Sequence, residues 1–446
     1  MDSRNASGRR PQRLLPLGTY PYPTPLPLSY MQRWWWELEQ VAGSTGQPLL
    51  AIPMTGPMKL VALESTLTEI LRRHAALRTR FIAQGSTAVP IVDAPTGVSL
   101  AIEDYSALGR EEGVAKATEL ADRYRLLPFE LNGGSLFRTC LVRLADDFHL
   151  LLIGIHHAIF DAWSGAILRW ELKVLYQAYL LGKASPLPEP RIQLCDLAIW
   201  ERHWIEAHDR PNPYAYWELR LAGVQPMKLP TDWPRRPGVR NSPEAMTAIE
   251  LPSETASALR QMSRTHGATV QTSLLAIYSM LLARWTGRAD VLIGSYTACR
   301  IPPGVGQLIG CLAANRPVYA TVAPELSFAT HLHRVRSAYS ETLDLKNPVS
   351  FRISWQTRLH GVVANLWKST QAPAESAREF QGKPAIIHHD LALALLETPD
   401  FIRGSVSYPA DLFAPATIAA FCRDFTIAAH AVAHDPQLTV AAATSR

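Results

Sequence analysis

The sequence predicts an α/β protein of the α+β type that folds as two lobes. With 446 residues the chain exceeds the size at which a single hydrophobic core stops growing, about 250 to 300 residues. Patterns typical of helices and of strands alternate in both halves, which favours sheets covered by helices. A third observation is the apolar run Leu150 to Ile155, which ends at two adjacent histidines and precedes a helical pattern.

Helix and strand patterns follow one another in the first half. From Val61 to Ala76 apolar residues recur at helical spacing, and the chain then continues through residues 77–81 as a strand. Two further strands are predicted at 136–144 and 148–155, around a turn at 145–147. Gly182 and Pro186 end the next helix. One of its faces is apolar and consists of Ile167, Leu168, Leu172, Leu175, Tyr176 and Tyr179.

The second half repeats this order after a crossover rich in proline and polar residues. The crossover, residues 183–240, has helical pieces near 194–208 and 213–223. Helices at 253–266 and 270–285 and a strand at 290–295 follow, with a mostly antiparallel or mixed sheet expected in each lobe. We therefore predict a flexible Pro-rich arm at 1–25, an N-terminal lobe at 26–185 and a C-terminal lobe, which includes the crossover, at 186–446.

Composition excludes several classes of protein. Hydrophobic residues make up 47% and charged residues 19%, as in soluble globular enzymes. The net charge of +5 is spread without a basic block, so no nucleic-acid partner is expected. No apolar stretch follows the N-terminal arginines, and the most apolar helix, 272–283, is too short for a bilayer. The five cysteines lack CxxC pairs and are odd in number, so no disulfide framework and a cytoplasmic location are expected. We also expect a monomer without membrane contact.

The two histidines that end the apolar run are the candidate catalytic residues. A neutral imidazole can take a proton from an attacking amine or hydroxyl, and His157 is the candidate base. His156 leaves the strand on the opposite face and is expected to be buried, satisfied by backbone partners, and structural. Asp161 either orients an imidazole or pairs with an arginine; the pairing is favoured, with Arg300 as partner, because a buried carboxylate needs one.

Ser164 follows one turn after Asp161 and has two open interpretations. It either caps the helix or donates a hydrogen bond to the reacting carbonyl oxygen. A serine hydrolase is excluded because no Gly-x-Ser-x-Gly pattern occurs. A metal site at His157 and Asp161 lacks a third ligand at suitable spacing. A lone histidine on an apolar strand is usually structural, but the tandem pair with Asp161 and Ser164 favours chemistry.

At these residues the chain resembles the condensation-domain family of nonribosomal peptide synthetases, whose signature is His-His-x-x-x-Asp-Gly-x-Ser. The similarity covers nearly everything after residue 27. Further segments that match family motifs in order are Ser29 to Trp35, Arg73 to Phe81, Asp196 to Trp200, Tyr216-Trp217, Leu229 to Asp232, Asp290 to Ser295, Ile309 to Pro317 and Asp411 to Phe413.

The resemblance implies two chloramphenicol-acetyltransferase-like lobes that form a V-shaped pseudo-dimer with a central tunnel. Carrier proteins bind at its mouths, and their phosphopantetheine arms reach the second histidine, here His157. The resemblance also implies that the chain itself binds no cofactor. In the family the motif aspartate pairs with an arginine, which supports Asp161 with Arg300.

The chain also departs from the family at its motifs. Ala162 replaces the motif glycine beside Trp163 and adds a methyl group, while the backbone amide is kept. Asn315 is followed by Arg316 where the family has Asn-Thr, and region 344–385 lacks the usual Tyr-Pro-Phe stretch. We count Ala162, Trp163 and Asn315, with Arg300, as supporting residues of the site.

The resemblance implies an acyltransferase of antibiotic biosynthesis. It would move an acyl or aminoacyl group from a carrier-protein thioester to a free or carrier-bound amine or alcohol, forming an amide or ester. No adenylation or carrier domain is recognised, so a free-standing condensation enzyme, or an excised one, is expected. Two alternatives stay open: a non-catalytic recruitment or docking module, which would bind without turnover, and a carrier-bound aminoacyl epimerase, which would exchange the α-proton without forming a bond.

Overall fold

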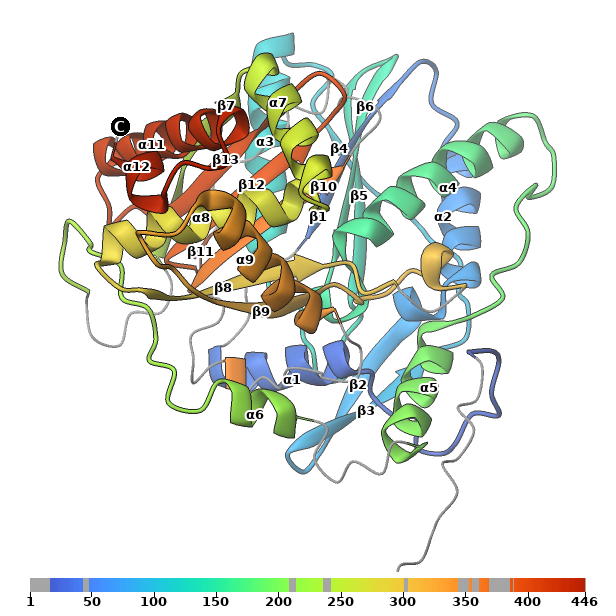
Figure 1. Cartoon of the computed structure of the whole chain (residues 1–446). Helices are drawn as coiled ribbons and strands as arrows, with labels where there is room; N and C mark the ends of the chain where they lie inside the picture. The colour runs from blue at the N-terminus through green and yellow to red at the C-terminus, as the bar shows by residue number, and fades with distance from the viewer. Residues whose placement is uncertain are drawn as a thin grey trace, which may run out of the picture. The chain divides into compact units, whose positions relative to one another are not determined.

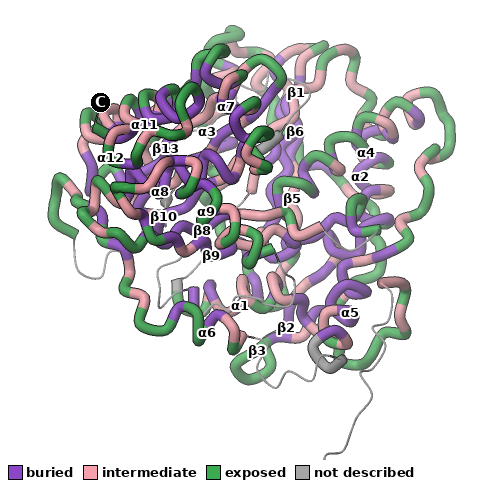
Figure 2. The backbone as a smooth tube through the Cα atoms, in the orientation of Figure 1, coloured by how far each residue is buried: buried purple, intermediate pink, exposed green. Residues whose placement is uncertain are grey.

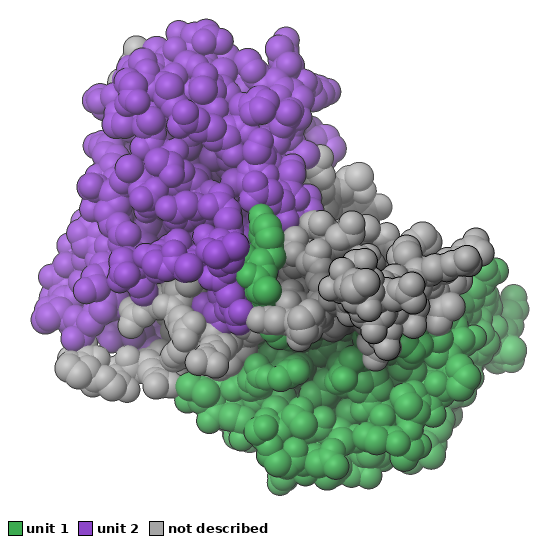
Figure 3. All heavy atoms as spheres, turned by 60° about the horizontal axis from the view of Figure 1, so that its bottom comes forward, with its two compact units in different colours: residues 1–216, 300–313 green, residues 217–299, 314–446 purple. Residues whose placement is uncertain are grey.

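A computed structural model describes residues 17–42, 48–207, 214–235, 242–300, 304–343, 353–354, 361–368, 386–387 and 389–445. The chain divides into two compact units, coloured separately in Figure 3. Unit 1 comprises Met1–Tyr216 and Arg300–Ala313, and unit 2 comprises Trp217–Cys299 and Ala314–Arg446. The sequence prediction divides the chain after residue 185, whereas unit 1 extends to Tyr216 and also takes segment 300–313. Residues 1–16 of the predicted arm and most of region 344–385 lie outside the described residues.

Unit 1 contains a four-stranded sheet in the order β1-β6-β5-β4. Its strands are β1 (Leu49–Thr55), β4 (Ala101–Asp104), β5 (Phe137–Ala145) and β6 (Phe148–Ile155). β6 pairs antiparallel with both β1 and β5, and β4 pairs parallel with β5. Every residue of β6 after Phe148 is buried, which explains its unbroken apolar run. In Figure 2 the tube of β6 is coloured as buried.

Helices and a small hairpin complete unit 1 (Figure 1). The hairpin pairs β2 (Thr79–Gln84) with β3 (Thr87–Val92). α2 and α4 lie side by side. The α-helices are α1 (Tyr30–Ala42), α2 (Leu60–Arg73), α3 (Arg110–Leu126), α4 (Ala162–Leu180), α5 (Leu194–Ala207) and α6 (Ala215–Arg220, across the junction of the units); the 3₁₀ helices are η1 (Ala75–Arg78), η2 (His157–Ile159) and η3 (Val305–Gln307).

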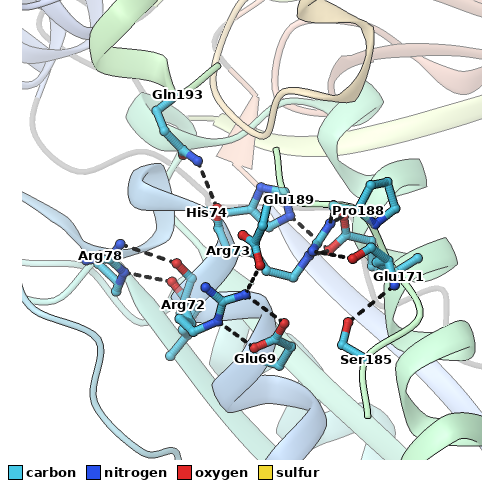
Figure 4. A network of polar contacts seen from close by, with 12 residues as sticks. Glu69, Arg72, Arg73, His74, Arg78, Glu171, Ser185, Pro188, Glu189 and Gln193 are labelled. Carbon is cyan, nitrogen blue, oxygen red and sulfur yellow. Dashed lines mark hydrogen bonds and ion pairs between the residues drawn. The ribbon is translucent and has the colours of Figure 1, made fainter. Parts of the chain in front are cut away.

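A buried polar network joins α2 to α4 and explains why the helix predicted to reach residue 76 ends at Arg73 (Figure 4). Arg73 Nε and Nη2 each donate to Glu171 at 3.1 Å, and His74 Nε2 lies 2.9 Å from the same carboxylate. His74 has extended backbone angles, which turn its side chain toward Glu171. Burial alone would raise the pKa of Glu171, but the bonds from His74 and Arg73 outweigh it and lower that pKa.

The same network also holds the segment that follows α4 against the end of α2. Arg73 Nη2 donates to the carbonyl of Pro188 at 2.9 Å, and Gln193 Nε2 donates to the carbonyl of Arg73 at 2.9 Å. The amide of Ala75 donates back to Gln193 at 2.9 Å. The crossover predicted from proline content is therefore held by hydrogen bonds over residues 188–193.

Unit 2 contains a seven-stranded mixed sheet in the order β11-β7-β13-β12-β10-β8-β9. β10 pairs parallel with β8 and β12, and the other pairs are antiparallel, so the mixed sheet expected from the sequence is confirmed for unit 2. The strands are β7 (Ser242–Leu251), β8 (Asp290–Thr297), β9 (Ala314–Thr321), β10 (Val362–Lys368), β11 (Ile386–Ile387), β12 (Leu391–Glu397) and β13 (Ile402–Pro409).

The helices of unit 2 pack on this sheet around one hydrophobic core. α8 is the most deeply placed: every residue from Thr272 to Leu282 is buried. Gly287 ends α8 in the left-handed conformation, with φ 66°, which glycine adopts without steric cost. The α-helices are α7 (Ser253–Thr265), α8 (Val270–Thr286), α9 (Phe328–Thr342), α11 (Pro415–His434) and α12 (Val440–Thr444).

Across the described ranges, none of the helices combines the length and the apolar content that a bilayer crossing requires.

Candidate active site

The double histidine lies where β6 ends and the chain turns into α4. The amide of His156 donates to the carbonyl of Leu136 at 3.0 Å. Because His156 follows β6 and Leu136 precedes β5, this bond extends the pairing of the two strands by one residue. The chain then forms the short helix η2, and Asp161 begins α4 as its N-cap. The three residues after His157 are buried, so they fix the turn by packing: Ala158, Ile159, Phe160.

His156 is buried, as the sequence predicts, and both ring nitrogens have partners. Nδ1 accepts a hydrogen bond from the amide of Ala158 at 2.9 Å, so the ring proton of the neutral imidazole is on Nε2. Nε2 donates to Glu39 of α1 at 2.6 Å, and the side chains of His156 and Glu39 are 0% and 8% exposed. The sequence prediction expects backbone partners; it missed Glu39, which no motif or spacing identifies.

His157 has the opposite arrangement of its ring proton. Its Nδ1 lies 3.3 Å from the carbonyl of Phe160, and because a carbonyl only accepts, Nδ1 donates and Nε2 carries the lone pair of the neutral ring. The ring stacks on Trp35, with centroids 4.8 Å apart and planes 6° from parallel. Desolvation is the largest cause that lowers the pKa of His157 to about 4. At pH 7 only about 0.1% of His157 would be protonated.

Asp161 braces the turn with both carboxylate oxygens. Oδ1 accepts from the amide and hydroxyl of Ser164, at 2.8 and 2.7 Å, and from Arg300 Nη2 at 2.9 Å. Oδ2 accepts from Arg300 Nη2 at 3.2 Å and from the amides of Leu312 and Ala313 at 3.1 Å. Of the two interpretations of Asp161, the pairing with Arg300 is the one present in unit 1.

Ser164 neither caps α4 nor presents its hydroxyl at a surface. Asp161 makes the capping bond, to the amide of Ser164. The hydroxyl is fully buried and lies 2.7 Å from Asp161 Oδ1, 2.9 Å from the carbonyl of Gly310 and 3.2 Å from Arg300 Nη2. It also accepts from the amide of Gly310 at 3.1 Å. These contacts place Ser164 in the junction between α4 and segment 304–313.

Arg300 completes this junction. Its Nη1 donates to the carbonyls of Val305 and Leu308, at 2.9 and 2.5 Å, and its side chain is 4% exposed. The guanidinium carbon lies 5.6 Å from the centre of the Trp163 ring, close enough for a cation–π contact. The indole nitrogen of Trp163 donates to the carbonyl of Gly306 at 2.9 Å.

Two predicted supporting residues make none of the contacts described above. Ala162 is the first residue of α4 and is exposed. Asn315 is in β9 of unit 2, opposite Tyr296 of β8. Asn315 therefore belongs to unit 2, whereas both histidines belong to unit 1.

The residues that the structure describes include no group of three or more histidine, cysteine or acidic side chains that could hold a metal ion.

Comparisons with known proteins identify the family. The model of the condensation-domain family matches residues 23–445. One subunit of the linear gramicidin synthase of Brevibacillus parabrevis is 30% identical over 436 residues, which cover 93% of this chain and 8% of the relative. Phosphinothricin tripeptide synthetase PhsC of Streptomyces viridochromogenes is 31% identical over 439 residues, which cover 94% of this chain and 40% of the relative. The chain thus spans a minor part of these relatives.

A solved structure agrees with the same fold. The X-domain in its complex with OxyB from teicoplanin biosynthesis superimposes with a TM-score of 0.82 at 23% identity, covering 95% of this chain and 96% of that chain. The family match over almost the whole length and the shared fold confirm the resemblance seen in the motifs, and the chain belongs to the condensation-domain family.

Proposed function

We propose that this chain transfers an acyl or aminoacyl group from a carrier-protein thioester to an amine or hydroxyl, forming an amide or an ester. The observation that carries the proposal is the state of His157. Its Nδ1 proton is directed to the carbonyl of Phe160, so Nε2 carries the lone pair of the ring, and the lowered pKa of about 4 keeps the ring neutral near pH 7.

His157 Nε2 accepts the proton of the nucleophile as its nitrogen or oxygen forms a bond to the thioester carbonyl carbon. The tetrahedral intermediate then collapses, the carbon–sulfur bond breaks, and the imidazolium returns the proton to the departing phosphopantetheine thiolate. Because the imidazole is a weak base, proton transfer accompanies bond formation, when the bound amine or alcohol becomes acidic. General base catalysis of this kind contributes about 10²- to 10⁴-fold.

Asp161, Ser164 and Arg300 support this step indirectly. Asp161 holds the first turn of α4 and the amides of Leu312 and Ala313, so the backbone on the α4 side of η2 is fixed at one end by a buried ion pair. A base that is held by rigid neighbours loses little entropy when the nucleophile binds, and positioning contributes much of the rate in such reactions.

The proposal is tested by supplying an acyl-loaded carrier protein and a panel of amines and alcohols and weighing the products. We expect His157→Ala to lower the rate of product formation at least 100-fold while circular dichroism stays unchanged. His333→Ala, at an exposed position of α9, is the matched control and keeps the full rate. A His157→Ala variant that forms product at the wild-type rate removes His157 from the reaction.

A second candidate function is recruitment of a partner enzyme without catalysis. The likeness to the X-domain, which was solved in complex with OxyB, is the specific observation that favours it. Binding of a partner enzyme together with no product from any loaded carrier and acceptor would support recruitment. Product that disappears in His157→Ala would support transfer.

A further inference from the structure

We propose that Glu39 is a positioning residue, which sets the orientation of His157 by acting through His156. The inference rests on the proposed function for its catalytic consequence, although its structural part stands by itself. Glu39 lies in α1, 117 residues before His156, and belongs to no part of the His-His-x-x-x-Asp motif.

Three groups form a continuous chain of hydrogen bonds from α1 to η2. Glu39 Oε1 accepts from His156 Nε2 at 2.6 Å, which is short even for a bond from a ring N–H to a carboxylate. Because the proton is on Nε2, Nδ1 is free to accept from the amide of Ala158 at 2.9 Å. That amide lies one residue after His157, so the ring of His156 holds the turn that carries the base.

The same helix also contacts the base directly. Trp35 and Glu39 are four residues apart in α1 and therefore lie on one face, one turn from each other. Trp35 stacks on His157, and Glu39 binds His156. One face of α1 thus holds both histidines of the motif, one by ring stacking and the other by a hydrogen bond.

The start of α1 is held independently of this contact. The amide of Gln32 donates to Ser29 Oγ at 3.2 Å and the amide of Ser29 donates to Gln32 Oε1 at 3.0 Å, which is a capping box. The amide of Tyr30 donates to Glu201 of α5 at 2.9 Å. α1 is therefore fixed at its N-terminus, so removal of Glu39 alone leaves the helix in place.

Loss of the Glu39 carboxylate would leave the Nε2–H of His156 buried without an acceptor. A buried donor without an acceptor lowers the stability of the folded state by about 1 to 3 kcal/mol. Rotation of the ring, or transfer of its proton to the other nitrogen, would relieve this cost. Either change removes the acceptor from the amide of Ala158. The turn at 157–159 then loses one of its fixed points, and His157 no longer has a single orientation.

The structural test is ¹⁵N NMR of the histidine rings in the full chain. In the wild-type protein we expect His156 to be neutral with its proton on Nε2, and His157 to be neutral with its proton on Nδ1. Glu39→Leu should alter the proton position or broaden the signals of both rings. Glu39→Gln keeps an acceptor oxygen and should preserve them. Unchanged signals of His156 and His157 in Glu39→Leu would overturn the inference.

The kinetic test compares Glu39 with Glu37 of the same helix, which forms a partly exposed ion pair with Arg33. Glu39→Leu should lower kcat about 10- to 100-fold with KM nearly unchanged, the loss found when a carboxylate that orients a metal-binding histidine is removed. Glu39→Gln should recover most of kcat, and Glu37→Leu should match the wild type. A wild-type kcat in Glu39→Leu contradicts the inference. If the wild-type chain forms no product, the proposed function fails, and the NMR result alone decides the role of Glu39.

Discussion

Asp161 and Arg300 lie 139 residues apart in the sequence and 2.9 Å apart in unit 1, with side chains that are 2% and 4% exposed. Their contact connects the N-terminus of α4 with the segment that runs from Arg300 to Ala313. Since neither charge reaches solvent, each is compensated by the other and by backbone groups, and removal of one leaves the other buried without its partner.

We expect Asp161→Ala to lower the free energy of unfolding by about 3 to 5 kcal/mol, the usual cost of breaking a buried pair at one side. Urea unfolding of the full chain measures this change. Asp93→Ala is the control, because Asp93 pairs with Arg80 at an exposed site, where ion pairs contribute at most about 1 kcal/mol. Equal losses in the two variants would contradict the role given to burial here.

A second prediction concerns Arg73 and Arg72, which are adjacent but differ in surroundings (Figure 4). Arg73 pairs with Glu171 at 3% and 4% exposure, whereas the Arg72 side chain is 43% exposed in its pairs with Glu69 and Glu189. We expect Arg73→Leu to lower the free energy of unfolding by about 3 to 5 kcal/mol and Arg72→Leu by at most about 1 kcal/mol. A chemical denaturation series on both variants decides between this ranking and its reverse.

The sequence predicted the surroundings of the histidines well because they depend on local patterns. The apolar run fixes β6, the Asp-Asp turn fixes its hairpin, and a helical pattern fixes α4, so the place of His156 and His157 follows from neighbours along the chain. The pairing of Asp161 with Arg300 could also be predicted, because a buried carboxylate requires a cation and the family motif supplies one.

Contacts between distant segments could not be predicted in the same way. Glu39 is one of several charged residues in α1, and only the register of that helix against η2 distinguishes it from Glu37. Ser164 could not be assigned because its hydroxyl also contacts the backbone of Gly310, 146 residues further along the chain. The helix end at Arg73 was missed because the buried carboxylate of Glu171 overrides a favourable helical pattern.

A third prediction links the acid sensitivity of unit 2 to His331 of α9, which is fully buried. Its Nε2 lies 2.9 Å from Ser279 Oγ, and since that hydroxyl donates to the carbonyl of Ala276 at 2.8 Å, Nε2 carries the ring proton. Desolvation is the largest cause that lowers the pKa of His331 from 6.5 to about 4. Between these values the unfolded chain binds more protons than the folded chain, so stability falls as the pH falls.

The expected loss for one such group is about 3 kcal/mol between pH 6.5 and pH 4. His331→Gln cannot take up this proton, so its unfolding free energy should depend less on pH over the same range. The matched control is His333→Gln, two residues further along α9 at an exposed position. If the two variants show the same pH dependence, His331 is not responsible for the acid sensitivity.

A fourth prediction separates two effects of Trp35 on His157. Stacking on an indole favours the charged imidazolium, whereas exclusion of water disfavours it, and desolvation is the largest cause that lowers the pKa of His157 to about 4. Trp35→Leu opens space for water, so the pKa of His157 should rise toward 6.5. Titration of the ring by NMR measures it, with Trp170→Leu, at an exposed position of α4, as control. A pKa that falls further would mean that the stacking contribution was the larger.

The lowered pKa of His157 also predicts the pH profile of the transfer reaction. The base is active when neutral, and with a pKa of about 4 it is neutral in about 90% of molecules at pH 5, where an ordinary histidine would be almost wholly protonated. With an alcohol as acceptor, whose own protonation does not change in this range, kcat should stay nearly constant from pH 7.5 to pH 5 and fall only as the pH approaches 4. An amine acceptor should instead lose rate together with its own deprotonated fraction, so the comparison of the two isolates the contribution of the enzyme. If kcat for the alcohol halves near pH 6.5, His157 titrates as an exposed imidazole during the reaction. The hypothesis that His157 acts as a desolvated base with a lowered pKa would then be wrong.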